Sequence, residues 1–396
     1  MMGQGWRRLA SAVIAMTVLG AVGCGSSSAP VDQNVVPDPR FQACLNKVLS
    51  QDPGAAISAQ QLGSVTGDIN CGGMNISSIE GVQFLTGITS LDLLNNNNLS
   101  DVGPIAGLAS SASLERLGFG GDQISDVSPF AAFAHSSSLA ELDLLANQIS
   151  DVAPLASLSG ASGFSKLYLD KNQIADITPL AGLTALSELS LNWNQIGDIT
   201  PLAGLTGLSV LGLGYNQISD VTPLAGFTNL TFLGLNGNQI GDISSLANMM
   251  ATWNKTIGGG VSVREQTVTL SLAAPGTIAS PVVSTTGEPV EMVAESGPVT
   301  VNADGTITCT AIGKAKLNWD TTAPRPGDLV FSGTLIVTVG ETPSATPAPD
   351  TPSVPPSSPP TEVGSSHGVL TMVIIGLAVV VVGAVFLLVR RSSKKK

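Results

Sequence analysis

The most regular feature of the chain is a hydrophobic pattern that recurs through its central part. Two leucines separated by one residue are followed three positions later by Asn, and then by Ile, Asp, Pro and Leu, as in the stretch 189–205. Self-similarity at a fixed short period predicts a solenoid of roughly eight stacked repeats, because one repeat alone cannot bury its hydrophobic face. The frame recurs at 91–108, 117–133, 142–158, 167–183, 189–205, 211–227 and 233–246, after a partial copy that begins at Ile69.

Each repeat divides into a strand, a turn and a short helical segment. The Leu-x-Leu alternation predicts a strand whose leucines face inward. The Asn that follows, such as Asn194, can both donate and accept hydrogen bonds, so stacked copies predict a ladder of buried amides. A Thr-Pro pair, such as Thr200-Pro201, predicts a hydroxyl N-cap before Pro at the first helical position. We therefore expect parallel strands on a concave face and short helical or 3-10 turns on the convex face.

The repeated string Asn-Gln-Ile-x-Asp-Ile-x-Pro-Leu-Ala-x-Leu-Thr resembles the 22-residue leucine-rich repeats of bacterial internalins, over about residues 36–250. The resemblance implies a leucine-rich repeat solenoid whose concave face binds a protein. The chain departs from the pattern in three places. Asp122 replaces a ladder Asn, the stretch 95–98 carries an extra residue, and the first three repeats have three more residues after the Pro, on the convex side.

The end of a solenoid needs a cap. Residues 36–68 read as two short helices, which resemble the internalin N-terminal cap, and the repeats then extend over 69–257. Cys44 lies in the first helix, and Cys71 lies at an inward strand position. Outside the cytoplasm the two cysteines are expected to form a disulfide, which would contribute roughly 3 kcal/mol by closing a loop of about 28 residues. A pair of buried thiols is the alternative.

The hydrophobic period changes after the repeats. Alternating segments between turn residues over 258–340 predict a small β-sandwich. Its place after the repeats resembles that of the internalin Ig-like domain, which implies that it covers the hydrophobic end of the solenoid. We expect Trp319 in its core, and Cys309 buried and unreactive.

The N-terminus has the pattern of an exported protein. A basic start and a short uncharged stretch over 1–23 predict a signal peptide. The string Ala21-Val22-Gly23-Cys24 resembles a lipobox, with Ala where Leu is typical, which implies lipidation of Cys24 and a tether over 24–35. Cleavage without lipidation is the alternative.

The C-terminus predicts a membrane anchor. The Pro, Ser and Thr of 341–367 indicate an extended stalk. The uncharged stretch 368–389 is long enough for a transmembrane helix, and the basic tail 390–396 is then cytoplasmic. We expect a single-pass protein of the cell membrane with an extracytoplasmic ectodomain. Sorting to a cell wall is the alternative, but 358–362 keeps only the Pro and Thr of Leu-Pro-x-Thr-Gly.

Charge and candidate chemistry narrow the function. The formal net charge is -12, and the ectodomain without the basic ends has ten basic and 29 acidic residues, a charge of -19. Such a chain is a poor candidate for binding nucleic acid. Neither His135 nor His367 has a plausible catalytic partner. The aspartates that recur in the turns each precede a helical segment, where an acidic side chain stabilises the N-terminus. This role is favoured over a calcium site. We therefore expect no enzyme, no cofactor and no metal site.

The outward strand positions are the candidate binding surface. Both tyrosines of the chain, Tyr168 and Tyr215, fall on this surface, and Trp193 lies at a strand exit. Exposed aromatic residues are typical of interface anchors, although Trp193 and Tyr215 could merely cover a turn. The acidic face favours a partner with a basic patch, which is a protein or alternatively a glycan. We expect the protein itself to be a monomer. We expect an adhesion protein, with an own-cell envelope scaffold or sensor as the alternative. The candidate residues are Asp92, Glu141, Asp143, Tyr168, Asp170, Glu188, Asn192, Trp193, Tyr215 and Phe232.

Overall fold

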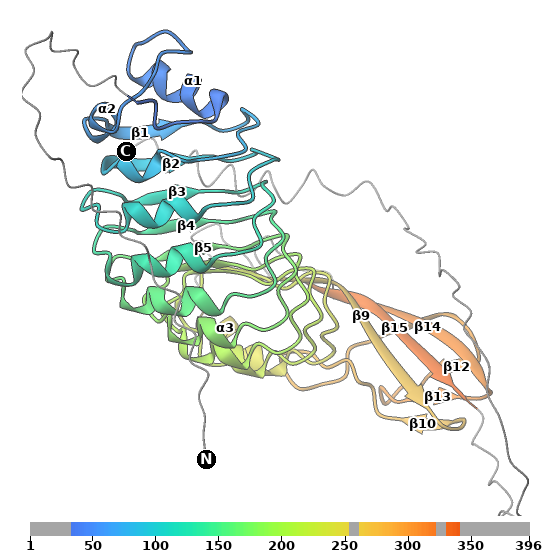
Figure 1. Cartoon of the computed structure of the whole chain (residues 1–396). Coiled ribbons are helices and arrows are strands. Elements are labelled where there is room, and N and C mark those ends of the chain that lie inside the picture. Colours follow the sequence, from blue (N-terminus) through green and yellow to red (C-terminus); the bar gives the residue numbers. More distant parts are fainter. Residues whose placement is uncertain (1–32, 253–260, 322–329, 341–396) are drawn as a thin grey trace, which may run out of the picture. The chain divides into compact units, whose positions relative to one another are not determined.

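The structure is a computed structural model that describes residues 33–252, 261–321 and 330–340 (Figure 1). The expected signal peptide, Cys24, most of the tether, the stalk, the transmembrane helix and the basic tail lie outside the described residues. Within the described ranges, no helix is long and apolar enough to cross a membrane. The described part comprises a helical cap, the repeats and a strand-rich segment that follows them.

The cap consists of two short helices that begin with side-chain hydrogen bonds. Helix α1 (Pro39–Val48) begins after Asp38, whose carboxylate accepts the N–H groups of Arg40 at 2.8 Å and Phe41 at 3.0 Å. Helix α2 (Ala59–Gly63) begins with a capping box formed by Ser58 and Gln61. Such caps satisfy N–H groups that have no partner within the helix.

A disulfide joins Cys44 on α1 to Cys71, the residue that follows strand β1 (Thr66–Asn70), so the expected pair is bonded in the structure. Both residues are buried, at 4% and 0% exposed. The bond fastens the cap to the first repeat.

Replacing both Cys44 and Cys71 with Ala should lower the free energy of unfolding by roughly 3 kcal/mol, because the unfolded chain gains the entropy of an open loop. Urea denaturation of the oxidised protein measures this loss. Reducing agent should destabilise the wild type and leave the double variant unchanged. Equal stability of the oxidised wild type and the variant would argue against this role.

The repeats form one parallel sheet. Its strands pair in chain order from β1 to β9, and β9 continues into the segment after the repeats. The inward leucines of successive strands are in register, as Leu167 is with Leu189. The strands after β1 are β2 (Gly87–Asp92), β3 (Arg116–Gly118), β4 (Glu141–Asp143), β5 (Lys166–Tyr168), β6 (Glu188–Ser190), β7 (Val210–Gly212), β8 (Phe232–Gly234) and β9 (Val261–Leu272).

The opposite side of the repeats is built from 3-10 turns, as predicted. The longest are those of the repeats that carry the insertions. The Thr of Thr-Pro is not the N-cap that we expected: Ile199 holds that position without a side-chain hydrogen bond. Instead, the Asp198 carboxylate accepts the N–H of Thr200 at 2.8 Å. The turns are η1 (Val82–Phe84), η2 (Gly103–Leu108), η3 (Ser128–His135), η4 (Ala153–Gly160), η5 (Thr178–Gly182), η6 (Thr200–Gly204), η7 (Thr222–Leu224) and η8 (Ser244–Leu246), which is followed by α3 (Ala247–Thr252).

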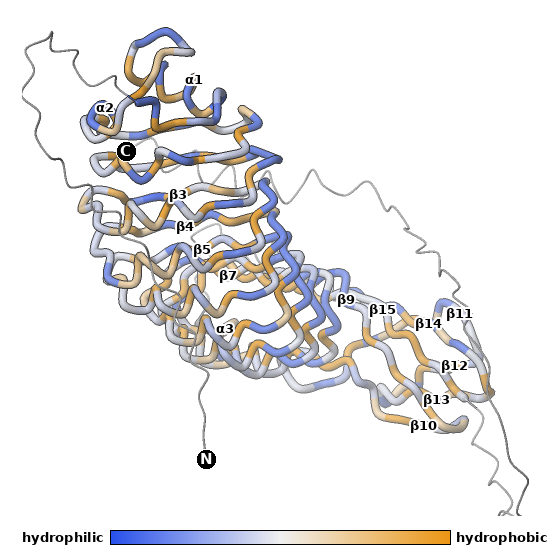
Figure 2. The backbone as a smooth tube through the Cα atoms, viewed as in Figure 1, coloured by the Kyte–Doolittle hydropathy of each residue, from blue (hydrophilic) through white to orange (hydrophobic). Residues whose placement is uncertain are grey.

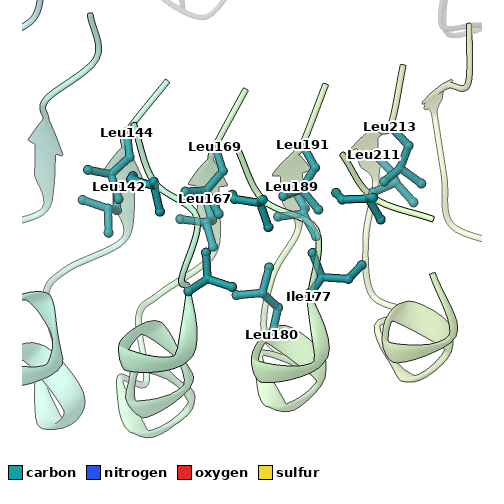
Figure 3. Close-up of a cluster of buried hydrophobic side chains, with 14 of the residues drawn as sticks. Leu142, Leu144, Leu167, Leu169, Ile177, Leu180, Leu189, Leu191, Leu211 and Leu213 are labelled. Carbon is teal, nitrogen blue, oxygen red and sulfur yellow. The ribbon is translucent and has the colours of Figure 1, made fainter. Parts of the chain in front are cut away.

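The core between strands and turns is a stack of leucine and isoleucine side chains. Leu167 and Leu189 lie side by side on adjacent strands, and Ile177 and Leu180 pack toward them from the helical side (Figure 3). All four are almost completely buried. Figure 2 shows that hydrophobic positions recur at the same place in successive repeats. Burial of this repeated set is the main force that stabilises the solenoid.

The expected ladder of asparagines lies in the turn after each strand. Asn194 donates from Nδ2 to the carbonyls of Leu169 at 2.9 Å and Leu191 at 3.0 Å, and its Oδ1 accepts the N–H of Ile174 at 3.0 Å. Each side chain therefore connects its own repeat to the preceding one. The same arrangement is made by Asn147, Asn172, Asn216 and Asn238.

Strand β9 belongs to both the solenoid and the segment after it. Its first part pairs in parallel with β8, and Gln266 takes the place of a ladder Asn by accepting the N–H of Ile240 at 3.1 Å and donating to the carbonyl of Leu235 at 2.9 Å. Its second part pairs with β15 (Val330–Val339). The buried end of the last repeat is therefore covered by a strand of the next segment.

The described residues after β9 form two groups of strands. One continues the solenoid sheet in the order β9-β15-β14-β11, and the other is a separate sheet in the order β10-β13-β12. Trp319 is buried, as expected, and packs edge to face on Phe331 with ring centroids 5.5 Å apart. Cys309 is buried too, and burial raises the pKa of its thiol. The remaining strands are β10 (Gly276–Ile278), β11 (Val293–Ser296), β12 (Val299–Val301), β13 (Ile307–Cys309) and β14 (Gly313–Thr321).

Candidate binding surface on the strands

The candidate surface, called the strand face below, consists of the outward side chains of β2 to β9 and of the residues at the strand exits. At each strand exit the chain turns through a residue with positive φ. A non-glycine residue in this conformation is strained, and a bulky one is uncommon. In successive repeats these residues form a column, called the strand-exit column. It comprises Asn95, Gly121, Ala146, Lys171, Trp193, Tyr215, Gly237 and Glu265, with φ values between 54° and 79°.

Trp193 and Tyr215 occupy adjacent places in this column, and their rings stack on each other. The ring centroids are 3.9 Å apart and the planes differ by 12°. Trp193 is 43% exposed, which is unusual for the largest side chain. Tyr215 is half-buried, and the two stacked rings form an apolar platform at the surface, called the aromatic platform below.

The aromatic platform is fixed at its far end by β9. The Tyr215 hydroxyl donates to Oε2 of Glu265 at 2.9 Å. Gly237 lies between them in the column, and a Cβ atom there would come within 2.5 Å of the Tyr215 ring. A residue without a side chain is therefore needed for the Tyr215 ring to extend toward β9. Burial and the Glu265 carboxylate together raise the pKa of the Tyr215 hydroxyl.

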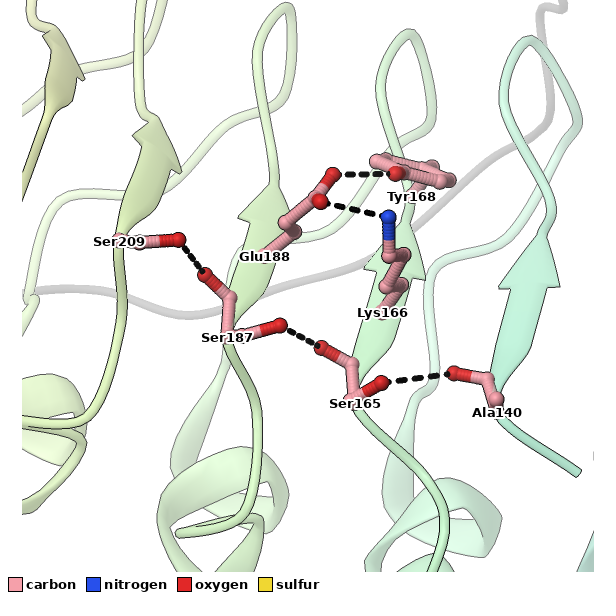
Figure 4. Close-up of polar contacts among 7 residues, drawn as sticks. All are labelled: Ala140, Ser165, Lys166, Tyr168, Ser187, Glu188 and Ser209. Atoms are coloured by element: carbon pink, nitrogen blue, oxygen red, sulfur yellow. Dashed lines mark hydrogen bonds and ion pairs between the residues drawn. The ribbon is translucent and has the colours of Figure 1, made fainter. Parts of the chain in front are cut away.

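Tyr168 is not the exposed anchor that we predicted. It is only 9% exposed, and its hydroxyl donates to Oε2 of Glu188 at 2.6 Å (Figure 4). Glu188 also forms an ion pair with Nζ of Lys166 at 2.6 Å. Neighbouring strands lie roughly 4.8 Å apart, so long outward side chains on β5 and β6 cover one another. The charge of Glu188 is therefore largely balanced within the strand face.

Two of the predicted acidic residues are also less accessible than expected. Asp143 is 2% exposed, and its Oδ1 accepts the N–H of Leu145 at 3.2 Å. Asp170 accepts hydrogen bonds from the hydroxyl of Ser190 at 2.6 Å and from Nδ2 of Asn192 at 2.6 Å. Burial raises the pKa of Asp170, and these hydrogen bonds oppose the rise. Both carboxyl groups therefore serve first to organise the strand exits.

The other candidates remain partly exposed at the surface. Asn192 is held by Asp170 and accepts the N–H of Gly214 at 2.7 Å. Phe232 is half-buried on β8, and its ring lies over Gly234. Asp92 and Glu141 are half-buried on β2 and β4. The structure thus places Asn192 and the aromatic platform at the exits of β6 and β7, and Phe232 on the adjacent strand β8.

Sequence reasoning missed Glu265, although a signal for it exists. The stretch Val261-x-Val263-x-x-Gln266 follows the frame Leu-x-Leu-x-x-Asn, with Glu265 at the strand-exit position. The alternation of the following residues obscured this last copy. The turn aspartates behave as predicted: hydrogen bonds from Thr178 and Thr200 lower the pKa values of Asp176 and Asp198. Among the described residues, no cluster of His, Cys, Asp and Glu could hold a metal ion.

Comparison with known proteins agrees with this architecture. The family model for leucine-rich repeats in two copies matches residues 165–204 and 206–248. The crystal structure of internalin C2 from Listeria monocytogenes is 36% identical, with a TM-score of 0.50, and the match covers 57% of this chain and 96% of that one. Internalin F from the same species is 31% identical, with a TM-score of 0.49, over 61% of this chain and 74% of that one. No match was found among curated proteins. The chain belongs to the internalin-like family of leucine-rich repeat proteins.

Proposed function

We propose that this protein is a cell-surface binding protein that uses the strand face to hold a protein partner. Internalin-like leucine-rich repeat proteins are generally protein-binding or adhesion proteins. The observation that supports the proposal most is the aromatic platform, in which an exposed Trp193 and a half-buried Tyr215 have strained backbones and lie at the surface instead of in the core. Strained residues of this kind are common at binding sites, where the surrounding structure must hold them.

The partner that we propose carries a basic patch. From β2 to β6 the strand face holds the half-buried Asp92 and Glu141, together with Asp143, Asp170 and Glu188, which are buried or paired within it. These five acidic residues stand against three basic residues, Arg116, Lys166 and Lys171. Charge complementarity of this kind speeds association and weakens with salt. We therefore expect the affinity to fall as the salt concentration rises, with the aromatic platform supplying the part of binding that salt leaves unchanged.

The remaining parts of the chain fit an anchored ectodomain. We propose that the strands from β9 to β15 form an Ig-like domain, since the four-stranded and three-stranded groups have the strand numbers of that fold. The domain would act as a spacer. The stalk, the transmembrane helix and the lipidated Cys24 that we expect from the sequence would hold it to the cell membrane. The alternative is an envelope scaffold or sensor with a partner in its own cell.

Replacing Trp193 and Tyr215 with Ala should reduce binding on the order of 1,000-fold, because two aromatic anchors at about 2 kcal/mol each contribute about 4 kcal/mol. Alanine is compatible with the column, since Ala146 already adopts the same conformation at φ 54°. Binding of labelled protein to foreign cells and to envelope fractions of the source cell measures the effect, and the two samples distinguish the two functions.

The matched control is the double change of Gln195 and Gln217 to Ala. These residues are exposed and lie two positions beyond each aromatic residue. The control should bind as the wild type does. Equal binding by the wild type and the aromatic double variant, in either sample, would contradict the proposed site.

A further inference from the structure

One ionisable side chain lies inside the ladder of asparagines. Asp122 occupies the ladder position of the repeat that contains β3 and is 7% exposed. Its Oδ1 accepts the N–H of Asn96 at 2.6 Å. Its Oδ2 is buried and has no hydrogen-bond partner in the structure. A buried carboxylate oxygen without a partner is costly, so its protonation state needs an explanation.

The neighbouring repeats show which chemistry this position requires. At the next ladder position, Nδ2 of Asn147 donates to the carbonyls of Phe119 at 2.8 Å and Leu144 at 3.1 Å. At the preceding position, Nδ2 of Asn96 donates to the carbonyls of Cys71 at 3.1 Å and Leu93 at 2.6 Å. A side chain at a ladder position therefore accepts a hydrogen bond through one atom and donates through the other. An ionised carboxylate has no hydrogen to donate, whereas a protonated carboxyl group has one.

The charges around Asp122 favour the protonated form as well. Burial is the main cause that raises the pKa of Asp122 to about 8; repulsion from Asp92 adds to the rise, and the hydrogen bond from Asn96 opposes it. The turn aspartates of this and the adjacent repeats are exposed and accept N–H groups of their own turns. The titratable groups of the adjacent strands and turns are Asp92 on β2, Glu115 just before β3, Arg116 on β3, Glu141 and Asp143 on β4, Asp101, Asp126 and Asp151 in the turns, and His135 at the end of η3.

We propose that Asp122 is a pH-sensitive element of the solenoid: as a neutral acid it completes the ladder, and on losing its proton it weakens the contact between the repeats of β2 and β3. The direction of the pH effect on stability follows from the pKa of Asp122 in the folded protein and in the unfolded chain. The folded protein holds this proton up to about pH 8, whereas the unfolded chain releases it near the ordinary value of 3.8. The stabilisation is therefore complete below about pH 4 and is lost as the pH rises toward 8.

Urea unfolding of the full chain in mild detergent, at pH 5 and pH 7, tests the proposal with Asp122→Asn, which restores the ladder amide. Between these pH values the unfolding constant of the wild type should rise on the order of 100-fold relative to that of Asp122→Asn. The control Asp151→Asn changes an exposed turn carboxyl group that has the same role as Asp198, and it should keep the wild-type pH dependence. Parallel pH profiles for the wild type and Asp122→Asn would overturn the proposal.

Infrared spectroscopy gives a second readout that does not depend on unfolding. At pH 6 the wild type should show the carbonyl band of protonated carboxyl groups, and Asp122→Asn should lose the part of this band that belongs to Asp122. Asp170, whose pKa burial also raises, contributes equally to both spectra. If Asp122→Asn does not fold, the converse change Asn194→Asp should introduce a second such band and steepen the pH dependence. The absence of a protonated carboxyl band in the wild type at pH 6 would overturn the proposal.

Discussion

Replacing Leu189 with Ala should lower the free energy of unfolding by about 3–5 kcal/mol, one of the largest losses expected in this chain. Leu189 is 0% exposed on the central strand β6 and is in register with Leu167 and Leu211 on the adjacent strands. These neighbours cannot move into the space, because each is held by the next repeat. The change therefore leaves a cavity in the middle of the solenoid. Urea or thermal denaturation measures the loss.

Leu145 provides the control for this prediction. It lies just after β4, two repeats away from Leu189, and is only half-buried on the strand face. Its replacement with Ala should cost less than about 1 kcal/mol, since little buried surface is lost. If the two substitutions had the same effect, the inward leucines would not be the main source of stability.

Replacing Asn194 with Ala should cost about 3 kcal/mol or more, although the change removes no large apolar group. The N–H of Ile174 would be left without its acceptor inside the solenoid. The carbonyls of Leu169 and Leu191 would each lose one of two donors, since Asn172 and Asn216 also donate to them, and each lost hydrogen bond contributes about 0.5–1.5 kcal/mol. A buried polar group that is left without a hydrogen bond costs about 1–3 kcal/mol. The adjacent Gln195 is exposed, and its replacement with Ala should have almost no effect in the same denaturation experiment. A small loss for Asn194→Ala would contradict the structural role of the ladder.

Much of the solenoid could be predicted because its period is short and strict. The spacing of Leu189, Leu191 and Asn194 determines which side chains face inward, and stacking repeats the arrangement. The cap helices and the pair Cys44–Cys71 followed from local signals. The prediction that the Thr200 hydroxyl forms the N-cap was wrong. The Asp198 carboxylate accepts the N–H of Thr200, and the turn begins one residue earlier than we expected.

The candidate surface was harder to predict, because strand alternation gives the direction of a side chain and not its accessibility. Tyr168 and Asp143 do lie on the strand face, yet both are buried there: Tyr168 bonds to Glu188 on the adjacent strand, and Asp143 accepts the N–H of Leu145 in its own strand exit. The stacking of Trp193 on Tyr215, and the hydrogen bond of Tyr215 to Glu265, join residues that are up to 50 positions apart. Such contacts depend on the register of whole repeats and on the conformation of the strand exits, neither of which local sequence specifies.

Photo-cross-linking from the strand face tests the central claim most directly. A photoreactive amino acid placed at Val210, an outward position on β7, the strand that leads to Tyr215, is compared with one at Ala181, an exposed position on η5. With cells or envelope fractions that bind the protein, we predict a covalent protein adduct from position 210 and none from position 181. An adduct from position 181 alone, or none from position 210 while binding persists, would contradict the claim that the strand face holds the partner.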